Sequence, residues 1–128
     1  MFSHIMVGSS DIARSQAFYD AVFAAMGAKS ATVDAKGRLI YAHRGGRFMV
    51  SKPINGEAAC HANGGTIGFL MESPAEVEAW HKAGAANGGK SVEDPPGIRK
   101  AAAGEIYLAY LRDPDGNKLC ALHRMAAK

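Results

Sequence analysis

The sequence predicts an α+β fold built from two βαβββ modules in tandem. The main observation is an internal repeat: residues 24–30 reappear as residues 85–91, with five identities in seven positions and a spacing of 61. Each copy ends a stretch with helical spacing of apolar residues, and each stretch follows a short apolar run. Short apolar runs separated by turn residues then follow each copy, which is typical of strands joined in hairpins.

In the first half, the apolar run at 5–7 predicts a strand, and Ser10 or Asp11 supplies the oxygen that caps the following helix. Gly27 ends this helix in the left-handed cap position. Three further strands are predicted, with turns at Lys36-Gly37 and Gly45-Gly46 between them; they cover residues 31–33, 39–42 and 48–50.

The second half repeats this order. The run at 67–71 predicts a strand, and Ser73 caps a helix with Pro74 at its first position and Glu76 at the capping-box position. Strands are predicted near 91–92, at 106–111 and at 118–122, the last two flanking the turn Asp113-Pro114-Asp115-Gly116. Residues 95–104 show no clear periodicity and are expected to form a loop.

Length and composition predict one domain, with module 1 at about 1–53, a linker at about 54–63 and module 2 at about 64–128. The net charge of +3 is small and scattered, so a nucleic-acid partner is not expected, and no apolar stretch is long enough to span a membrane. The amino terminus lacks the pattern of a secretion signal. Cys60 and Cys120 are expected to be free thiols in the cytoplasm.

Two motifs carry a family resemblance. The final hairpin contains Asp113-Pro114-Asp115-Gly116-Asn117, and the first helix contains Ser15-Gln16-Ala17-Phe18-Tyr19. Together with the duplicated module and a first strand that begins at His4, they resemble the glyoxalase, bleomycin-resistance and extradiol-dioxygenase superfamily over nearly the whole chain. The resemblance implies the vicinal-oxygen-chelate fold, in which the modules form a curved mixed sheet around a cleft with helices on the convex side.

The resemblance also implies a cleft lined by alternate strand residues, because residues two apart share one face of a strand. We expect the lining to consist of Met6, Phe48, Val50, Gly68, Leu70, Leu108 and Tyr110. This lining could hold an apolar or aromatic small molecule.

The metal site that the family implies is degenerate in this sequence. His4 matches the first-strand histidine of the family and could bind metal as a neutral imidazole, or simply form a hydrogen bond at the strand end. Thr66 and Cys120 stand where two further ligands are implied, and residues 47–52 contain no Glu, His or Gln for the fourth. The expected cofactor is therefore none, or a single divalent metal such as Zn, Ni, Mn or Fe.

Two functions remain open from the sequence. By resemblance the chain is a lactoylglutathione-lyase-type enzyme with a degenerate metal site; the alternative is a metal-free protein of the bleomycin-resistance kind that sequesters a small molecule. No catalytic residue can be assigned, because no carboxylate stands where the proton-transfer base is implied. Candidates for binding an anion are Arg38, Arg44, Lys52, Arg99 and Lys100. Short family members usually pair as homodimers, and we expect the same here.

Overall fold

The computed structural model describes residues 1–126. The elements in chain order are β1 (Ile5–Gly8), α1 (Ile12–Ala24), β2 (Thr32–Val33), β3 (Leu39–His43), β4 (Gly46–Ser51), β5 (Ile67–Leu70), α2 (Pro74–Ala86), β6 (Lys90–Ser91), β7 (Gly97–Ala101), β8 (Gly104–Arg112) and β9 (Lys118–Arg124). The first module has the predicted βαβββ order. The second has one strand more than predicted, and the last two residues of its expected span lie outside the described residues.

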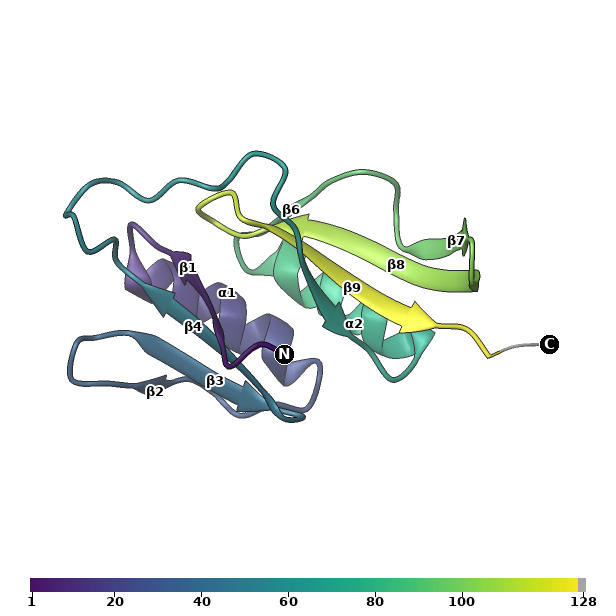
Figure 1. The fold of residues 1–128 in the computed structure, drawn as a ribbon, viewed down its shortest axis with the longest axis horizontal. Helices are drawn as coiled ribbons and strands as arrows, with labels where there is room; N and C mark the ends of the chain where they lie inside the picture. The colour runs from purple at the N-terminus through teal and green to yellow at the C-terminus, as the bar shows by residue number, and fades with distance from the viewer. Residues whose placement is uncertain (127–128) are drawn as a thin grey trace.

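The strands form two curved sheets that do not close into a barrel (Figure 1). One sheet has the order β1-β4-β3-β2, and the other has the order β5-β9-β8-β6, with β7 also paired to β8. In each sheet the first strand of the module runs parallel to the last, and the hairpin pairs are antiparallel. The two modules therefore share one topology, as the sequence repeat predicts.

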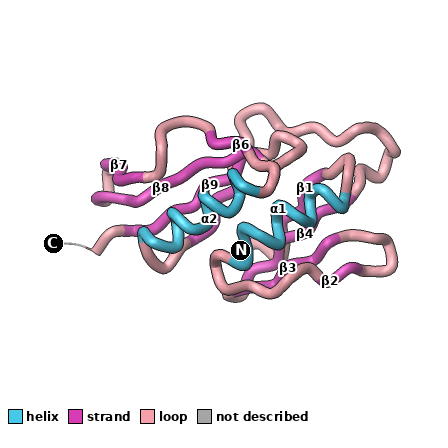
Figure 2. Tube along the Cα trace, turned by 180° about the vertical axis from the view of Figure 1, so that it is seen from behind, coloured by secondary structure: helices cyan, strands magenta, loops and turns pink. Residues whose placement is uncertain are grey.

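Both helices cover the same face of the two sheets, and they pack against each other (Figure 2). The core lies between the helices and the sheets and includes residues of both modules, among them Phe18, Tyr19, Trp80 and Leu111. No helix in residues 1–126 has the length and apolar character needed to cross a bilayer. Within residues 1–126, no helix covers the opposite face of either sheet; we call it the open face.

The helix caps follow the sequence closely. Asp11 rather than Ser10 caps α1, because its side chain accepts a hydrogen bond from the Arg14 N–H. The Ser10 hydroxyl instead accepts from the Ala59 N–H at 2.8 Å and so fastens the segment between the modules. Gly27 has a φ of +82°, a left-handed conformation that glycine adopts without strain.

In the second module, Ser73 caps α2 by accepting from the Glu76 N–H. In a capping box the Glu76 carboxylate would accept from the N–H of Ser73, but here it accepts from the N–H of Glu72, one residue earlier. The same carboxylate also binds Arg44 of the first module. The cap of α2 is therefore part of the contact between the modules.

The expectation of a loop at 95–104 is corrected by β7, which pairs with β8 over five residues. β6 and β7 follow one another along the same edge of β8, with a bend between them. The strand was missed because it lies at a sheet edge and is mostly exposed, so its side chains do not alternate clearly between apolar and polar.

The two family-like motifs meet at the junction of the modules. Asp113 is 4% exposed and accepts a 2.5 Å hydrogen bond from the Tyr19 hydroxyl of α1. Asp115 accepts from the Ser10 N–H, the Ser15 hydroxyl and the Arg14 guanidinium. The hairpin of module 2 is thus hydrogen-bonded to the helix of module 1, and these residues fix how the two sheets sit beside each other.

Candidate functional site

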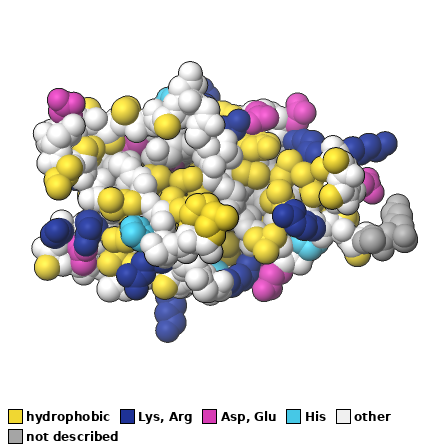
Figure 3. Space-filling model, in the orientation of Figure 1, with side chains coloured by type: hydrophobic (Ala, Val, Ile, Leu, Met, Phe, Trp, Pro, Cys, Tyr) yellow, Lys and Arg dark blue, Asp and Glu magenta, His cyan; other side chains and the backbone are white. Residues whose placement is uncertain are grey.

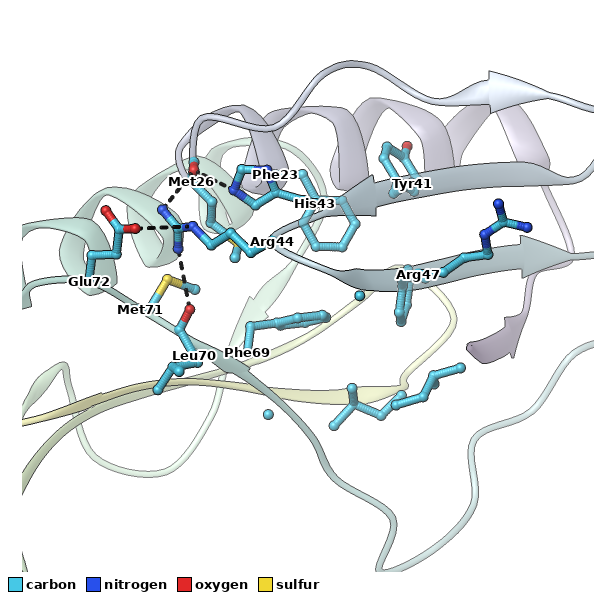
Figure 4. A pocket seen from close by; sticks show the side chains of 15 residues that line it. Phe23, Met26, Tyr41, His43, Arg44, Arg47, Phe69, Leu70, Met71 and Glu72 are labelled. Atoms are coloured by element: carbon cyan, nitrogen blue, oxygen red, sulfur yellow. Dashed lines mark hydrogen bonds and ion pairs between the residues drawn. The ribbon is translucent and has the colours of Figure 1, made fainter. Parts of the chain in front are cut away.

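A pocket of about 360 Å³ lies at the junction of the two modules, between β4 of the first and β5 of the second (Figure 4). We call it the seam pocket. Its lining is mostly apolar and consists of Ile5, Phe23, Met26, Tyr41, His43, Arg44, Gly46, Arg47, Phe48 and residues 67–72. A pocket of this size with a mainly apolar wall and a few polar groups is typical of small-molecule sites.

Three aromatic rings form the wall of the seam pocket. The ring centroids of Phe23, Phe48 and Phe69 lie 5.3–5.6 Å apart, and each pair meets edge to face. Such contacts are favourable because the positive ring edge meets the negative ring face. Phe69 comes from module 2 and the other two from module 1, so the wall depends on how the modules are joined.

Arg44 closes one end of the seam pocket. It lies at the tip of the β3–β4 hairpin with a φ of +50°, and its guanidinium forms two hydrogen bonds with the Glu76 carboxylate, at 2.7 and 3.0 Å. It also donates to the backbone carbonyls of Met26 and Leu70. The hydrogen bonds with Glu76 raise the pKa of Arg44 and lower that of Glu76, so both stay charged at neutral pH.

Two other polar side chains of the seam pocket, His43 and Arg47, differ in whether they already form a hydrogen bond within the chain. His43 Nε2 lies 3.0 Å from the Met26 carbonyl, so this ring nitrogen is already used. The Arg47 side chain is exposed and forms no hydrogen bond or ion pair with any residue in the described part of the chain. Figure 4 shows its guanidinium pointing away from Arg44. The interior of the pocket is therefore apolar, and charge is confined to its ends.

The residues expected to line a cleft do not share one face. The register places Met6 opposite Met49 on the open face of the first sheet, whereas Ile5 and Val7 pair with Phe48 and Val50 on the helix-covered face. Val50 is completely buried in the core, and Phe48 instead contributes to the seam pocket. The reason is strand parity: β4 enters the sheet in a register that puts Met49, not its neighbours, beside Met6.

In the second sheet, the expected cleft residues do share the open face. Gly68 and Leu70 pair through Cys120 and Leu122 with Tyr110 and Leu108. Leu70 is 65% exposed and Met6 of the first sheet is 51% exposed. One face of the Tyr110 ring is covered by the Lys118 ammonium, 4.9 Å from the centroid, and Lys118 also forms an ion pair with Glu93.

The three positions implied for a metal lie at separate strands of the open faces. His4 is exposed, and its Nδ1 lies 2.8 Å from the Ser3 hydroxyl. Thr66 is exposed, two residues before Gly68, and offers only a hydroxyl. Cys120 is buried beside Tyr110, and burial raises the pKa of its thiol, so the thiolate that a metal would need is disfavoured.

These side chains do not fit a glyoxalase-type metal centre within one chain. No three His, Cys, Asp or Glu side chains among residues 1–126 come close enough together to hold an ion. Two further histidines serve other contacts: His123 Nδ1 bonds to the Met71 carbonyl and His81 Nε2 to the Ser91 hydroxyl. Burial lowers the pKa of His81, which favours the neutral imidazole.

Sequence reasoning missed most of the seam pocket. Tyr41, Phe69 and Met71 fall within predicted strands and Phe23 within the predicted first helix, and only the contact between the modules turns them into a pocket wall. The repeat itself was the available signal, because joining two modules creates a junction that neither module has alone.

The family model described as Glyoxalase/Bleomycin resistance protein/Dioxygenase superfamily matches residues 1–121. A glyoxalase/bleomycin resistance protein from Albidiferax ferrireducens T118 is 51% identical, with a TM-score of 0.93 over 97% of this chain and 99% of that one. A family enzyme from Burkholderia phytofirmans PsJN is 16% identical, with a TM-score of 0.72 over 96% and 98% of the two chains. A lactoylglutathione lyase from Agrobacterium tumefaciens is 19% identical, with a TM-score of 0.66 over 96% and 92%. A comparison with curated proteins returned no match.

The chain therefore belongs to the glyoxalase/bleomycin resistance protein/dioxygenase superfamily. Members of this superfamily bind small molecules, often with a divalent metal and often as dimers. The structural likeness to the Agrobacterium tumefaciens and Burkholderia phytofirmans proteins shows a shared fold. Because the sequence identity to both is low, it shows no more than that.

Proposed function

We propose that this protein binds a small, flat, largely apolar molecule in the seam pocket without using a metal, in the manner of a sequestering protein. The observation that carries the proposal is the pocket itself, with its three aromatic rings contributed by both modules. Edge-to-face rings leave apolar surface for an aromatic ligand to stack against.

The composition of the pocket supports a ligand with little charge. Arg44 is satisfied by Glu72, Glu76 and two carbonyls, and His43 is engaged with Met26, so neither needs a ligand for its polar groups. A neutral aromatic compound would displace water from apolar walls without leaving these groups unpaired.

The lyase function implied by the family finds less support in the side chains. Isomerisation of a hemithioacetal needs a base that moves a proton between neighbouring carbons, and Cys120 replaces the glutamate that the family implies there. The raised pKa of the Cys120 thiol makes it a poor substitute at neutral pH. Turnover remains the function to test against the binding proposal.

Two further features belong to the proposal. We expect the chain to act in the cytoplasm, as its two unpaired cysteines suggest. We also expect a homodimer, because Leu70 is exposed on the open face of the second sheet and apolar side chains gather on the face seen in Figure 3.

Calorimetric titration with coumarin, an uncharged bicyclic aromatic, tests the proposal. The wild-type protein is expected to bind it saturably, one molecule per chain. Ile67 is half-buried at the seam pocket, so Ile67→Trp should fill the pocket and weaken binding at least tenfold, about 1.4 kcal/mol. Ile5→Trp fills the pocket from the other module and serves as a second variant should the first fold poorly.

Ile98→Trp is the matched control. Ile98 is half-exposed on β7 and does not line the seam pocket, so this variant should bind coumarin as the wild type does. The proposal fails if coumarin does not bind, if Ile98→Trp weakens binding as much as Ile67→Trp, or if the wild type turns over a methylglyoxal–glutathione hemithioacetal with added nickel or zinc.

A further inference from the structure

A second pocket lies at the end of the first sheet where β1 and β4 finish, beside the turn between β2 and β3. It has a volume of about 760 Å³ and shares no residue with the seam pocket. Met6 and Ile54 contribute its apolar surface, and Lys36, Arg38 and Lys52 contribute its charge. We call it the basic pocket.

The charge of the basic pocket has one sign. Its lining contains three cationic side chains and no carboxylate. Lys36 and Lys52 form no ion pair with any residue between 1 and 126. Three cations gathered around an opening raise the local concentration of anions, an effect that salt weakens.

Asp34 holds the turn in place without closing the pocket. Its carboxylate accepts from the backbone N–H groups of Lys36 and Arg38, at 2.9 and 3.0 Å. It also accepts from Arg38 Nε at 2.6 Å. These hydrogen bonds lower the pKa of Asp34 and leave both terminal nitrogens of Arg38 without a partner in the described residues. The turn thus presents Arg38 with its outer donors free for a ligand.

The apolar part of the basic pocket is also exposed. Met6 is half-exposed on β1, and Ile54 projects fully into solvent after Pro53. Figure 3 shows dark-blue side chains near the turn between β2 and β3, close to yellow side chains of the open face. Apolar surface beside two unpaired lysines and the free terminal nitrogens of Arg38 matches a molecule with an anionic head and an apolar body.

We propose that the basic pocket binds a small amphipathic anion, whose carboxylate or phosphate head meets Lys36, Arg38 and Lys52 and whose apolar body rests on Met6 and Ile54. Arg38 can donate two parallel hydrogen bonds to such a head, and the lysines add charge from the β2–β3 turn and from the end of β4. The basic pocket is separate from the seam pocket. The inference therefore does not depend on the function proposed for the seam pocket.

Calorimetric titrations with octanoate, octyl phosphate and octanol test the inference. The wild type should bind octanoate or octyl phosphate saturably and octanol at least tenfold more weakly, and the tighter anion identifies the preferred head group. The double variant Lys36→Gln/Lys52→Gln should weaken anion binding about three- to tenfold, as expected for two partly solvated charge contacts. Raising the salt concentration should narrow the difference between the wild type and this variant.

Two controls locate the binding. Lys82→Gln removes an exposed charge on α2 and should change nothing, while Ile67→Trp should leave anion binding intact because it alters only the seam pocket. Thermal melting confirms that each variant is folded. Equal affinity for octanol, no saturable binding of either anion, or an effect of Ile67→Trp or Lys82→Gln as large as that of the double variant would overturn the inference.

Discussion

Tyr19 shows what a single residue of the first helix contributes. It is completely buried and packs against Phe18, Phe23 and Phe48, yet its hydroxyl needs a partner. Asp113 provides that partner from the other module. Burial and the nearby charge of Asp113 raise the pKa of Tyr19 well above its ordinary value, so the phenol remains a donor.

Replacing Tyr19 by Phe should lower the free energy of unfolding by about 1–3 kcal/mol, because the buried Asp113 carboxylate loses a hydrogen bond. Urea denaturation measures this change. Tyr107→Phe is the control, since the Tyr107 hydroxyl bonds to Glu78 at the exposed surface, and it should have little effect. If both variants lower the free energy of unfolding equally, the buried hydrogen bond between the modules contributes no more to stability than an exposed one.

At the scale of elements, the β3–β4 hairpin is joined to the start of α2 by Arg44 and Glu76. The Glu76 side chain is mostly buried, and its paired oxygens face the guanidinium. The hydrogen bonds with Arg44 lower the pKa of Glu76 below the ordinary value of 4.5. A carboxyl whose pKa is lower in the folded state contributes stability above its unfolded pKa and loses it as the pH falls through the folded pKa.

Glu76→Gln should therefore flatten the dependence of stability on pH below about 4.5, and it should lower stability at pH 7. Thermal melting between pH 3 and 7 measures both effects. Glu72→Gln is the matched control, because Glu72 also faces Arg44 but its side chain is 73% exposed, so screening by water weakens the pair. If Glu76→Gln and the wild type show the same dependence of stability on pH, the Arg44–Glu76 pair does not contribute to stability as proposed.

The sequence predicted most elements because their signals are local. Asp11, Ser73 and Pro74 mark helix starts, and Asp-Pro-Asp-Gly marks the last turn, whatever surrounds them. The face on which Phe48 and Val50 lie was not predictable, since the register between β1 and β4 joins segments about 40 residues apart. The seam pocket could not be predicted for the same reason, because its wall exists only where Phe69 of one module meets Phe23 and Phe48 of the other.

For the whole molecule, the covered and uncovered faces of the sheets have different roles. Both helices lie on one face (Figure 2), and the other face exposes Leu70 together with further apolar side chains (Figure 3). We propose that a second copy of the chain covers part of this face, as dimers are frequent in the superfamily.

Sedimentation of the wild type should then give twice the chain mass of 13.5 kDa. Leu70→Glu should shift it toward the monomer, because a carboxylate would be placed in an apolar contact. Ile98→Glu, on an exposed part of β7, should leave the dimer unchanged. A wild type that sediments as a monomer at micromolar concentration would contradict the proposed pairing.

For the whole molecule, we propose that the seam pocket binds its ligand without a metal. The most direct measurement is the affinity for coumarin of protein treated with a chelator, compared with the same protein given one equivalent of nickel, zinc, manganese or iron(II). We predict that the dissociation constants agree within about twofold, since Phe23, Phe48 and Phe69 form the binding surface. Loss of binding after chelation, or binding at least tenfold tighter with one equivalent of metal, would contradict the claim.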